Sequence, residues 1–194
     1  RNVAMGFGLV NFAAAAVAAY LKRSPASRVA VLDWDVHHGN GVSAWVAAEG
    51  RARYCSLHEM GGFPQTGQDE SERGLLGNIL NIPLPKGSGS AEYLEAVRRK
   101  ALPFLLGDEQ PDLLLICAGY DALEADPLAT MALKPADYAE CVRQICSEHG
   151  FPPERVALGL EGGYSLDEDI GMPAAVVATC AALLEQQGRG GGAR

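Results

Sequence analysis

Short apolar runs alternate along the chain with longer stretches of mixed composition. The runs are rich in Val, Ile and Leu, as buried strands usually are, and they lie at residues 28–33, 53–57, 78–84, 112–117 and 155–160. The stretches between them predict helices at residues 11–22, 40–48, 90–102, 135–148 and 173–184. Apolar strands that alternate with helices predict an α/β fold, a three-layer and mostly parallel sheet with helices on both faces.

Several segments differ from this simple alternation. Residues 78–84 are expected to form an edge strand, because Pro83 has no N–H to donate to a neighbouring strand. Residues 155–160 are expected to form another buried strand. A long polar, glycine-rich loop is expected from residue 58 to about residue 74. We expect residues 1–187 to belong to one domain and the sequence GRGGGAR at 188–194 to be a flexible tail.

Composition narrows the class of protein. The 194 residues are 48% hydrophobic, which suits one domain with a sizeable core. Sixteen Lys and Arg against 24 Asp and Glu give a net charge of −8. This charge disfavours direct nucleic-acid binding and anionic membranes, and mildly favours cationic substrates. The longest apolar stretch, residues 12–21, is too short to span a bilayer. Five cysteines without a CxxC pair indicate a reducing compartment, which we take as the cytoplasm.

Polar residues follow three of the predicted strands. Asp35 and His37 come after the first strand and are two positions apart, so on an extended backbone their side chains share a face. Asp121 follows a different strand and would complete three metal ligands, which leaves coordination positions open for catalysis. Asp33 lies on the same face and could equally hold the metal ligands in place without binding the metal itself. Taken singly, however, an Asp at a strand end is often only a cap or a turn former.

Longer motifs link these residues to a known family. The sequence DWDVHHGNG at 33–41 resembles the metal-binding motif of the histone deacetylase and acetylpolyamine amidohydrolase superfamily. Further motifs follow in that superfamily's order: MGFG at 5–8, SLH at 56–58, FPQTG at 63–67, AGYDALEADPL at 118–128 and EGGY at 161–164. The resemblance implies an arginase-deacetylase-like fold, with this chain as the C-terminal portion of the catalytic domain.

The resemblance also implies a role for each motif residue. One Zn²⁺ per chain is expected on Asp35, His37 and Asp121, with a K⁺ beside it on Asp33, Ser56 and Leu57. Tyr164 is expected to donate a hydrogen bond to the developing oxyanion. Residues expected along the substrate are Gly6, Phe7, Phe63, Leu128 and Gly163. Core packing is the alternative for the two phenylalanines, and loop packing is the alternative for Leu128. His38 is expected to support the metal ligands from a neighbouring position or to be structural, and His58 is expected to be structural.

The implied activity is zinc-dependent hydrolysis of an acetyl or other acyl amide. Leu128 follows the Asp-Pro pair where polyamine-specific relatives often carry Glu, which favours acetyl-lysine or a small acetylated amine as substrate. The family's His-His general base precedes the MGF motif in relatives, whereas this sequence starts at Arg1. We therefore expect the N-terminal part of the domain to be missing and this chain alone to be a poor catalyst. The alternative is a catalytically inactive metal-binding remnant that acts as an interaction module, and an oligomer is left open.

Overall fold

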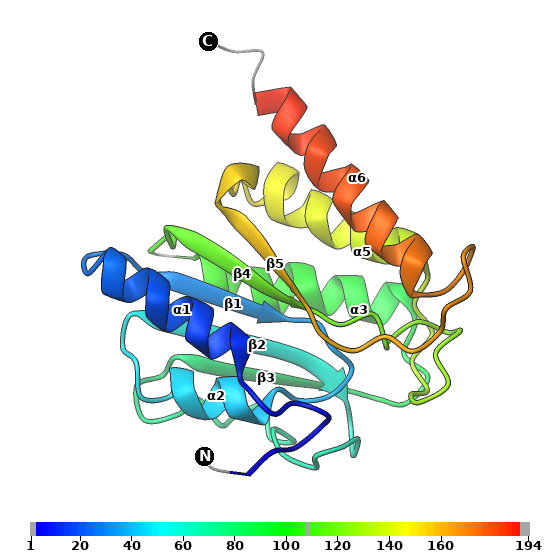
Figure 1. Cartoon of the computed structure of the whole chain (residues 1–194), viewed down its shortest axis with the longest axis horizontal. Helices are drawn as coiled ribbons and strands as arrows, with labels where there is room; N and C mark the ends of the chain where they lie inside the picture. Colours follow the sequence, from blue (N-terminus) through cyan, green and yellow to red (C-terminus); the bar gives the residue numbers. More distant parts are fainter. Residues whose placement is uncertain (1–2, 108, 191–194) are drawn as a thin grey trace.

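Five parallel strands form the centre of the computed structural model, which describes residues 3–107 and 109–190 (Figure 1). In chain order they are β1 (Val29–Asp33), β2 (Ala52–Glu59), β3 (Ile79–Leu84), β4 (Leu113–Ala118) and β5 (Val156–Leu160). Their order across the sheet is β3-β2-β1-β4-β5, so β1 lies in the middle and β3 at an edge, as Pro83 predicted. Asp33, the last residue of β1, lies opposite Ser56 of β2 and Cys117 of β4.

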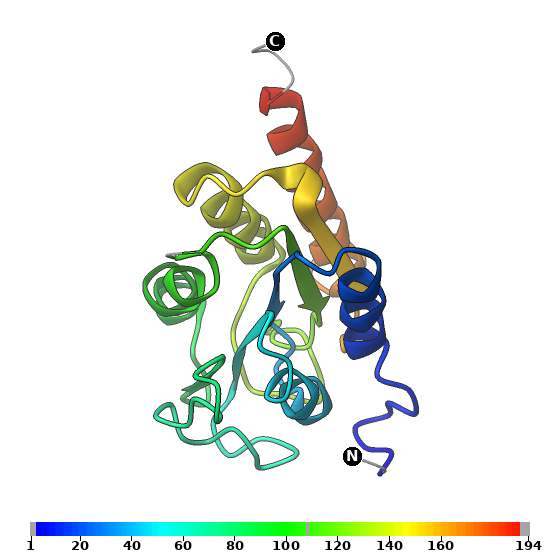
Figure 2. The same ribbon diagram turned by 90° about the vertical axis from the view of Figure 1, so that its left-hand side faces the viewer.

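Helices cover both faces of this sheet, as Figure 2 shows with the sheet nearly edge-on. One face carries α1 (Phe12–Arg23) and α2 (Asn40–Val46), and the other carries α3 (Ser90–Ala96), α4 (Leu102–Leu106) and α5 (Pro135–Arg143). The helix α6 (Met172–Gly190) packs chiefly against α5. Within the described part of the chain, no helix is both long and apolar enough to cross a membrane.

Side chains along β1 alternate between two cores because successive residues of a strand point to opposite faces. Val29 and Val31 pack with α1 and α2, whereas Ala30 and Leu32 pack in the larger core with α3, α4 and α5. All of them are buried, so the uninterrupted apolar run reflects a strand covered on both faces. The α/β class and the three-layer arrangement predicted from the sequence are confirmed.

Two helical runs contain a wider turn. The first continues from α3 through a π-helical turn at Val97–Ala101 into α4, and the second continues from α5 through a π-helical turn at Gln144–Glu148. Pro103 lies just after the first of these turns and cannot donate a backbone hydrogen bond, so a local change of helix geometry is expected there. A 3₁₀ turn at Pro153–Arg155 then leads into β5.

Two expectations need correction. The strand β5 is only half-buried, and Leu160 is 67% exposed, because the side chains of Val156, Ala157 and Leu158 are only partly covered by the two cores. The apolar composition of β5 therefore predicted burial wrongly. The last helix was expected to end at Leu184 but continues to Gly190, so residues 188–190 are helical rather than part of a tail. Gln186 helps to anchor this extension by accepting a hydrogen bond of 2.7 Å from Ser147 Oγ. Residues 191–194 lie outside the described part of the chain.

Candidate active site

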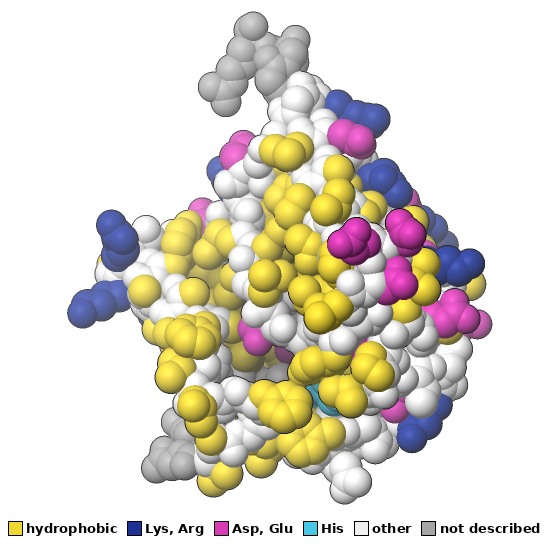
Figure 3. All heavy atoms as spheres, turned by 45° about the vertical axis from the view of Figure 1, so that its right-hand side comes forward, with side chains coloured by type: hydrophobic (Ala, Val, Ile, Leu, Met, Phe, Trp, Pro, Cys, Tyr) yellow, Lys and Arg dark blue, Asp and Glu magenta, His cyan; other side chains and the backbone are white. Residues whose placement is uncertain are grey.

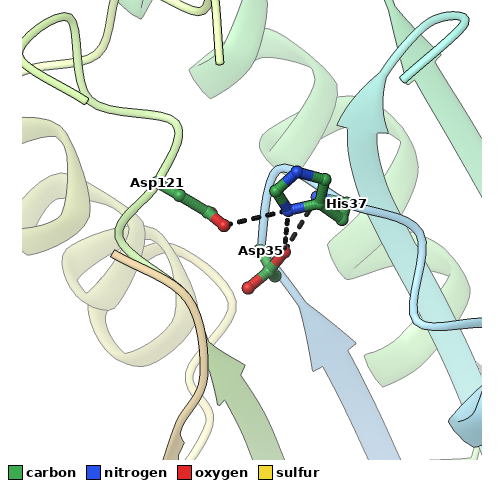
Figure 4. A group of neighbouring side chains, drawn as sticks. All are labelled: Asp35, His37 and Asp121. Carbon is green, nitrogen blue, oxygen red and sulfur yellow. Dashed lines mark hydrogen bonds and ion pairs between the residues drawn. The ribbon is translucent and has the colours of Figure 1, made fainter. Parts of the chain in front are cut away.

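The carboxyl ends of β1 and β4 bring together two carboxylates and one imidazole (Figure 4). His37 Nδ1 lies 3.1 Å from Asp35 Oδ1 and 3.0 Å from Asp121 Oδ2. One ligand atom from each side chain can be chosen so that all three lie within 4.8 Å of one another. Asp121 is fully buried, while Asp35 and His37 are partly open to solvent. The three residues that the sequence proposed as metal ligands thus form one cluster.

Backbone N–H groups fix both carboxylates in place. Val36 N donates to Asp121 Oδ1 at 2.8 Å, and Gly162 N donates to Asp35 Oδ2 at 2.8 Å. Gly162 can approach so closely only because it lacks a side chain, since a Cβ there would overlap the carboxylate oxygens of both aspartates. The glycine at position 162 is therefore explained by the room that these carboxylates need.

The cluster is strongly acidic. Hydrogen bonds to Asp121 and Asp35 raise the pKa of His37 to about 10. Burial, together with the charge of Asp35, raises the pKa of Asp121 to about 6. Burial and the same two aspartates also raise the pKa of Glu161. A cation at this position would offset the repulsion among the carboxylates, and carboxylate oxygen with imidazole nitrogen is a normal zinc ligand set. The residues present therefore fit a divalent zinc ion.

Aromatic rings lie on two sides of this cluster. The ring of Phe63 meets that of His37 edge-on with centroids 6.3 Å apart, and Phe7 meets Tyr164 edge-on at 6.1 Å. Phe7 is 87% exposed and Phe63 is 52% exposed, so core packing, the alternative for both, is wrong. A Cβ at Gly6 would lie 3.3 Å from the Phe63 ring, which places Gly6 against that ring.

Tyr164 lies beside the acidic cluster on the segment that follows β5. Gly163, just before it, has a φ of 137°, a conformation that favours glycine, and a Cβ there would press on Met172 and Tyr120. Tyr164 is 38% exposed. Burial and the charges of Asp121 and Asp35 raise the pKa of its phenol, so the ring stays protonated at neutral pH.

A second group of predicted residues lies buried where β1 and β2 run side by side. Asp33 Oδ2 accepts a 2.6 Å hydrogen bond from Tyr54, and its Oδ1 accepts one of 3.2 Å from Asp35 N. Ser56 and Leu57 on β2 are fully buried. Burial, followed by the charge of Asp35, raises the pKa of Asp33 well above its usual range. A buried carboxyl group next to hydroxyl and carbonyl oxygens fits a hard monovalent cation such as K⁺.

The other histidines of this region are held away from the cluster. His38 Nδ1 lies 2.7 Å from Thr66 Oγ1, and His58 lies 2.9 Å from both Ser56 Oγ and Gly67 O. Burial lowers the pKa of each ring to about 4. Both rings are therefore held by neighbouring protein groups.

One buried carboxylate near Tyr164 was given no role of its own from the sequence. Asp126 Oδ1 accepts a 2.9 Å hydrogen bond from Leu128 N, and Asp126 Oδ2 accepts a 2.8 Å hydrogen bond from Tyr164 N. Leu128 itself is 54% exposed, so its side chain is open to solvent, and loop packing stays the alternative to a substrate contact. The Asp-Pro pair indicates a turn, but no local pattern reveals a partner 38 residues away.

Comparison with known proteins agrees with this geometry. The sequence profile of the histone deacetylase domain matches residues 1–180, which include every residue of the candidate site. The chain belongs to the histone deacetylase family. An uncharacterized protein of Synechocystis sp. is 48% identical over 166 residues, 86% of this chain and 53% of that protein. The histone deacetylase-like amidohydrolase of Pseudomonas aeruginosa is 38% identical over 168 residues, 84% of this chain and 43% of that protein.

The fold also matches a solved member of this superfamily. The acetylpolyamine aminohydrolase of Burkholderia pseudomallei superposes with a TM-score of 0.76 at 29% identity, over 94% of this chain and 51% of that one. The chain thus spans about half the length of each of these three proteins. Membership of this family of deacetylases and amidohydrolases makes hydrolysis of an amide the general chemistry to be considered for the site.

Proposed function

We propose that the protein is a zinc-dependent deacetylase that hydrolyses acetyl-lysine or a small acetylated amine. The observation that carries this proposal is the convergence of Asp35, His37 and Asp121 beside Tyr164. Three protein ligands leave coordination open, which suits a catalytic rather than a structural metal. The family match supports amide hydrolysis as the reaction.

Each ligand side chain has a defined task in this proposal. Asp35, His37 and Asp121 hold the metal, and His37 must first release the proton that its two carboxylate neighbours stabilise. Zinc bound there would supply Lewis-acid polarisation of the acetyl carbonyl and lower the pKa of water. Asp33, Ser56 and Leu57 would hold K⁺, whose charge offsets the repulsion between Asp33 and Asp35.

Tyr164 provides the hydrogen-bond donor. Its raised pKa keeps the phenolic proton in place at neutral pH, so the hydroxyl can donate to an oxygen that becomes negative during the reaction. A donor fixed in advance stabilises developing charge without reorganisation at the moment of reaction. Phe7 and Phe63 would flank an apolar acyl-lysine chain, and Gly6, which lies against the Phe63 ring, and Gly163, which precedes Tyr164, would line the same path.

The test measures acetate release by the zinc-loaded chain from an acetyl-lysine peptide and from N-acetylputrescine, and slow but detectable turnover is expected of it. Tyr164→Phe should bind one zinc per chain, as the unmodified protein should, but turn over about 10²–10³ times more slowly. Removing the metal with a chelator should abolish turnover, and added zinc should restore it. Stoichiometric zinc binding without any turnover by the unmodified protein would instead support an inactive metal-binding module.

A further inference from the structure

Asp126 connects two segments that lie far apart in the sequence. One of its carboxylate oxygens accepts from Leu128 N at 2.9 Å and the other accepts from Tyr164 N at 2.8 Å. The residue is only 6% exposed, and its own N–H donates to Leu123 O at 2.9 Å. Both oxygens of the buried carboxylate are therefore used, and both bind backbone rather than another side chain.

The segment that carries Asp126 is itself firmly held. Leu133 N donates to Ala122 O, and Glu124 N donates to Leu133 O, which closes the loop after β4 on itself. Glu59, at the end of β2, accepts from both Thr130 N at 2.9 Å and Thr130 Oγ1 at 2.5 Å. This ties the loop to the sheet, so Asp126 projects from a fixed support.

Tyr164 has a less rigid setting. It follows Gly163, a conformationally flexible residue whose φ is 137°. Tyr164 is 38% exposed, and its ring has an edge-on contact with Phe7. The position of the phenol therefore depends on the backbone at residue 164. A carboxylate that accepts from a backbone N–H forms a charge-assisted hydrogen bond, which is stronger than a neutral one.

We propose that Asp126 is a positioning residue, which holds the Tyr164 backbone to the loop that carries Asp121 and so aims the phenol at the metal cluster. This inference rests on the proposed function, because it assigns Asp126 an effect on turnover only through Tyr164. The same carboxylate also fixes the backbone of Leu128. It therefore holds Tyr164, the proposed hydrogen-bond donor, and the proposed substrate-facing Leu128 in a fixed relative position.

Asp126→Asn is the informative variant. An amide has the shape of a carboxylate but only one acceptor oxygen, and its NH₂ group would face one of the two N–H donors. The matched control is Asp137→Asn, because Asp137 is another buried carboxylate, 8% exposed, that accepts from Lys134 N and Ser90 Oγ at 2.7 Å. It caps α5 and has no contact with Tyr164 among its hydrogen bonds.

The decisive measurement is a double-mutant cycle on the zinc-loaded full chain with an acetyl-lysine peptide. Asp126→Asn should lower kcat about 10- to 100-fold, since a misplaced catalytic group costs that much, and zinc content should stay at one per chain. In the Tyr164→Phe background the same substitution should change kcat by about twofold or less, because the group it positions is gone. Asp137→Asn should leave kcat unchanged in both backgrounds.

A spectroscopic readout tests the contact independently of turnover. In ¹H–¹⁵N spectra the amide resonances of Tyr164 and Leu128 should move strongly in Asp126→Asn and stay in place in Asp137→Asn. Unmoved resonances would overturn the proposal, as would equal losses of kcat in both backgrounds of the cycle. Both results leave the proposed function intact, whereas wild-type turnover in Tyr164→Phe alone would remove the tyrosine from the mechanism and the positioning role with it.

Discussion

At the scale of single residues, His37 connects the two carboxylates of the candidate metal site. Its Nδ1 lies within hydrogen-bond distance of two carboxylates from different strand ends, and without a cation those groups hold a proton on the ring. A zinc ion would take the place of that proton and share the same three side chains. Removing the imidazole therefore removes a ligand and leaves the two carboxylates near each other without a positive charge between them.

His37→Ala should abolish stoichiometric zinc binding, as measured by elemental analysis of protein dialysed against a low concentration of zinc. His149→Ala is the matched control, because His149 follows the helical run of α5 and contributes nothing to the cluster. The control should retain one zinc per chain. Unchanged metal content in His37→Ala would show that the ligands were assigned wrongly.

Leu128 allows a test of substrate choice. Its side chain is 54% exposed while its backbone is fixed by Asp126, so a longer polar side chain can be placed there without disturbing the core. Leu128→Glu should shift kcat/KM in favour of N-acetylputrescine over an acetyl-lysine peptide, because the carboxylate can pair with the free ammonium group. Leu184→Glu, at a 66% exposed position on α6, adds the same charge elsewhere and should leave the ratio unchanged. An unchanged ratio in Leu128→Glu would assign selectivity to another position.

Part of the candidate site could be predicted from the order of strands and polar residues. The rule that parallel strands end at one edge brings Asp35, His37 and Asp121 to the same place. The expectation of an extended backbone at Asp35 and His37 was wrong, because β1 ends at Asp33 and residues 35–37 form bends. Asp126 could not be found in this way, because its partner Tyr164 lies on a segment that only the folded sheet brings near. The exposure of Phe7 and Phe63 could not be predicted either, because an apolar residue in a sequence is more often buried than part of an exposed binding surface.

At the scale of helices and strands, local sequence patterns predicted where each element lies better than they predicted how far it is buried. All five strands were found from apolar runs, but the half-exposure of β5 could not be predicted from its own five residues. The strand β3, at the opposite edge of the described sheet, is equally apolar and is buried. The extension of α6 to Gly190 likewise depends on α5, since Gln186 meets Ser147 across the helix pair. Helix capping, in contrast, depends on residues close together in the sequence, so a single substitution can test it.

Asn11 caps α1, because its Oδ1 accepts from Ala14 N at 2.9 Å. Asn11→Ala should lower the free energy of unfolding by about 1 kcal/mol, the usual effect of losing such a cap. Asn11→Asp keeps an acceptor at the helix N-terminus and should retain or slightly increase stability. Urea denaturation followed by circular dichroism measures both, and equal stability of Asn11→Ala and the unmodified protein would show that the cap is not limiting.

At the scale of the whole molecule, hydrophobic side chains gather on the face that carries β5 and α6. Figure 3 shows them around a hollow in which acidic side chains are visible. Leu160 at the end of β5, Leu166 and Ile170 in the following loop, and Val177 on α6 are each more than half exposed. Among the described residues the outer edge of β5 has no strand partner, so unpaired backbone groups lie beside this apolar surface. Such a combination favours association, because it offers both hydrogen bonds and apolar area.

The chain on its own should therefore associate as its concentration rises, which sedimentation velocity between about 1 and 100 µM can follow. Leu160→Lys should reduce this association, since a lysine at a strand edge opposes pairing with another edge. Leu75→Lys is the matched control, because Leu75 is fully exposed but lies in the loop between β2 and β3 and gains the same charge. Both variants should keep the melting temperature of the unmodified protein. If Leu75→Lys reduced association as much as Leu160→Lys, net charge rather than the β5 face would govern it, and a chain that stays monomeric at the highest concentration would contradict the prediction.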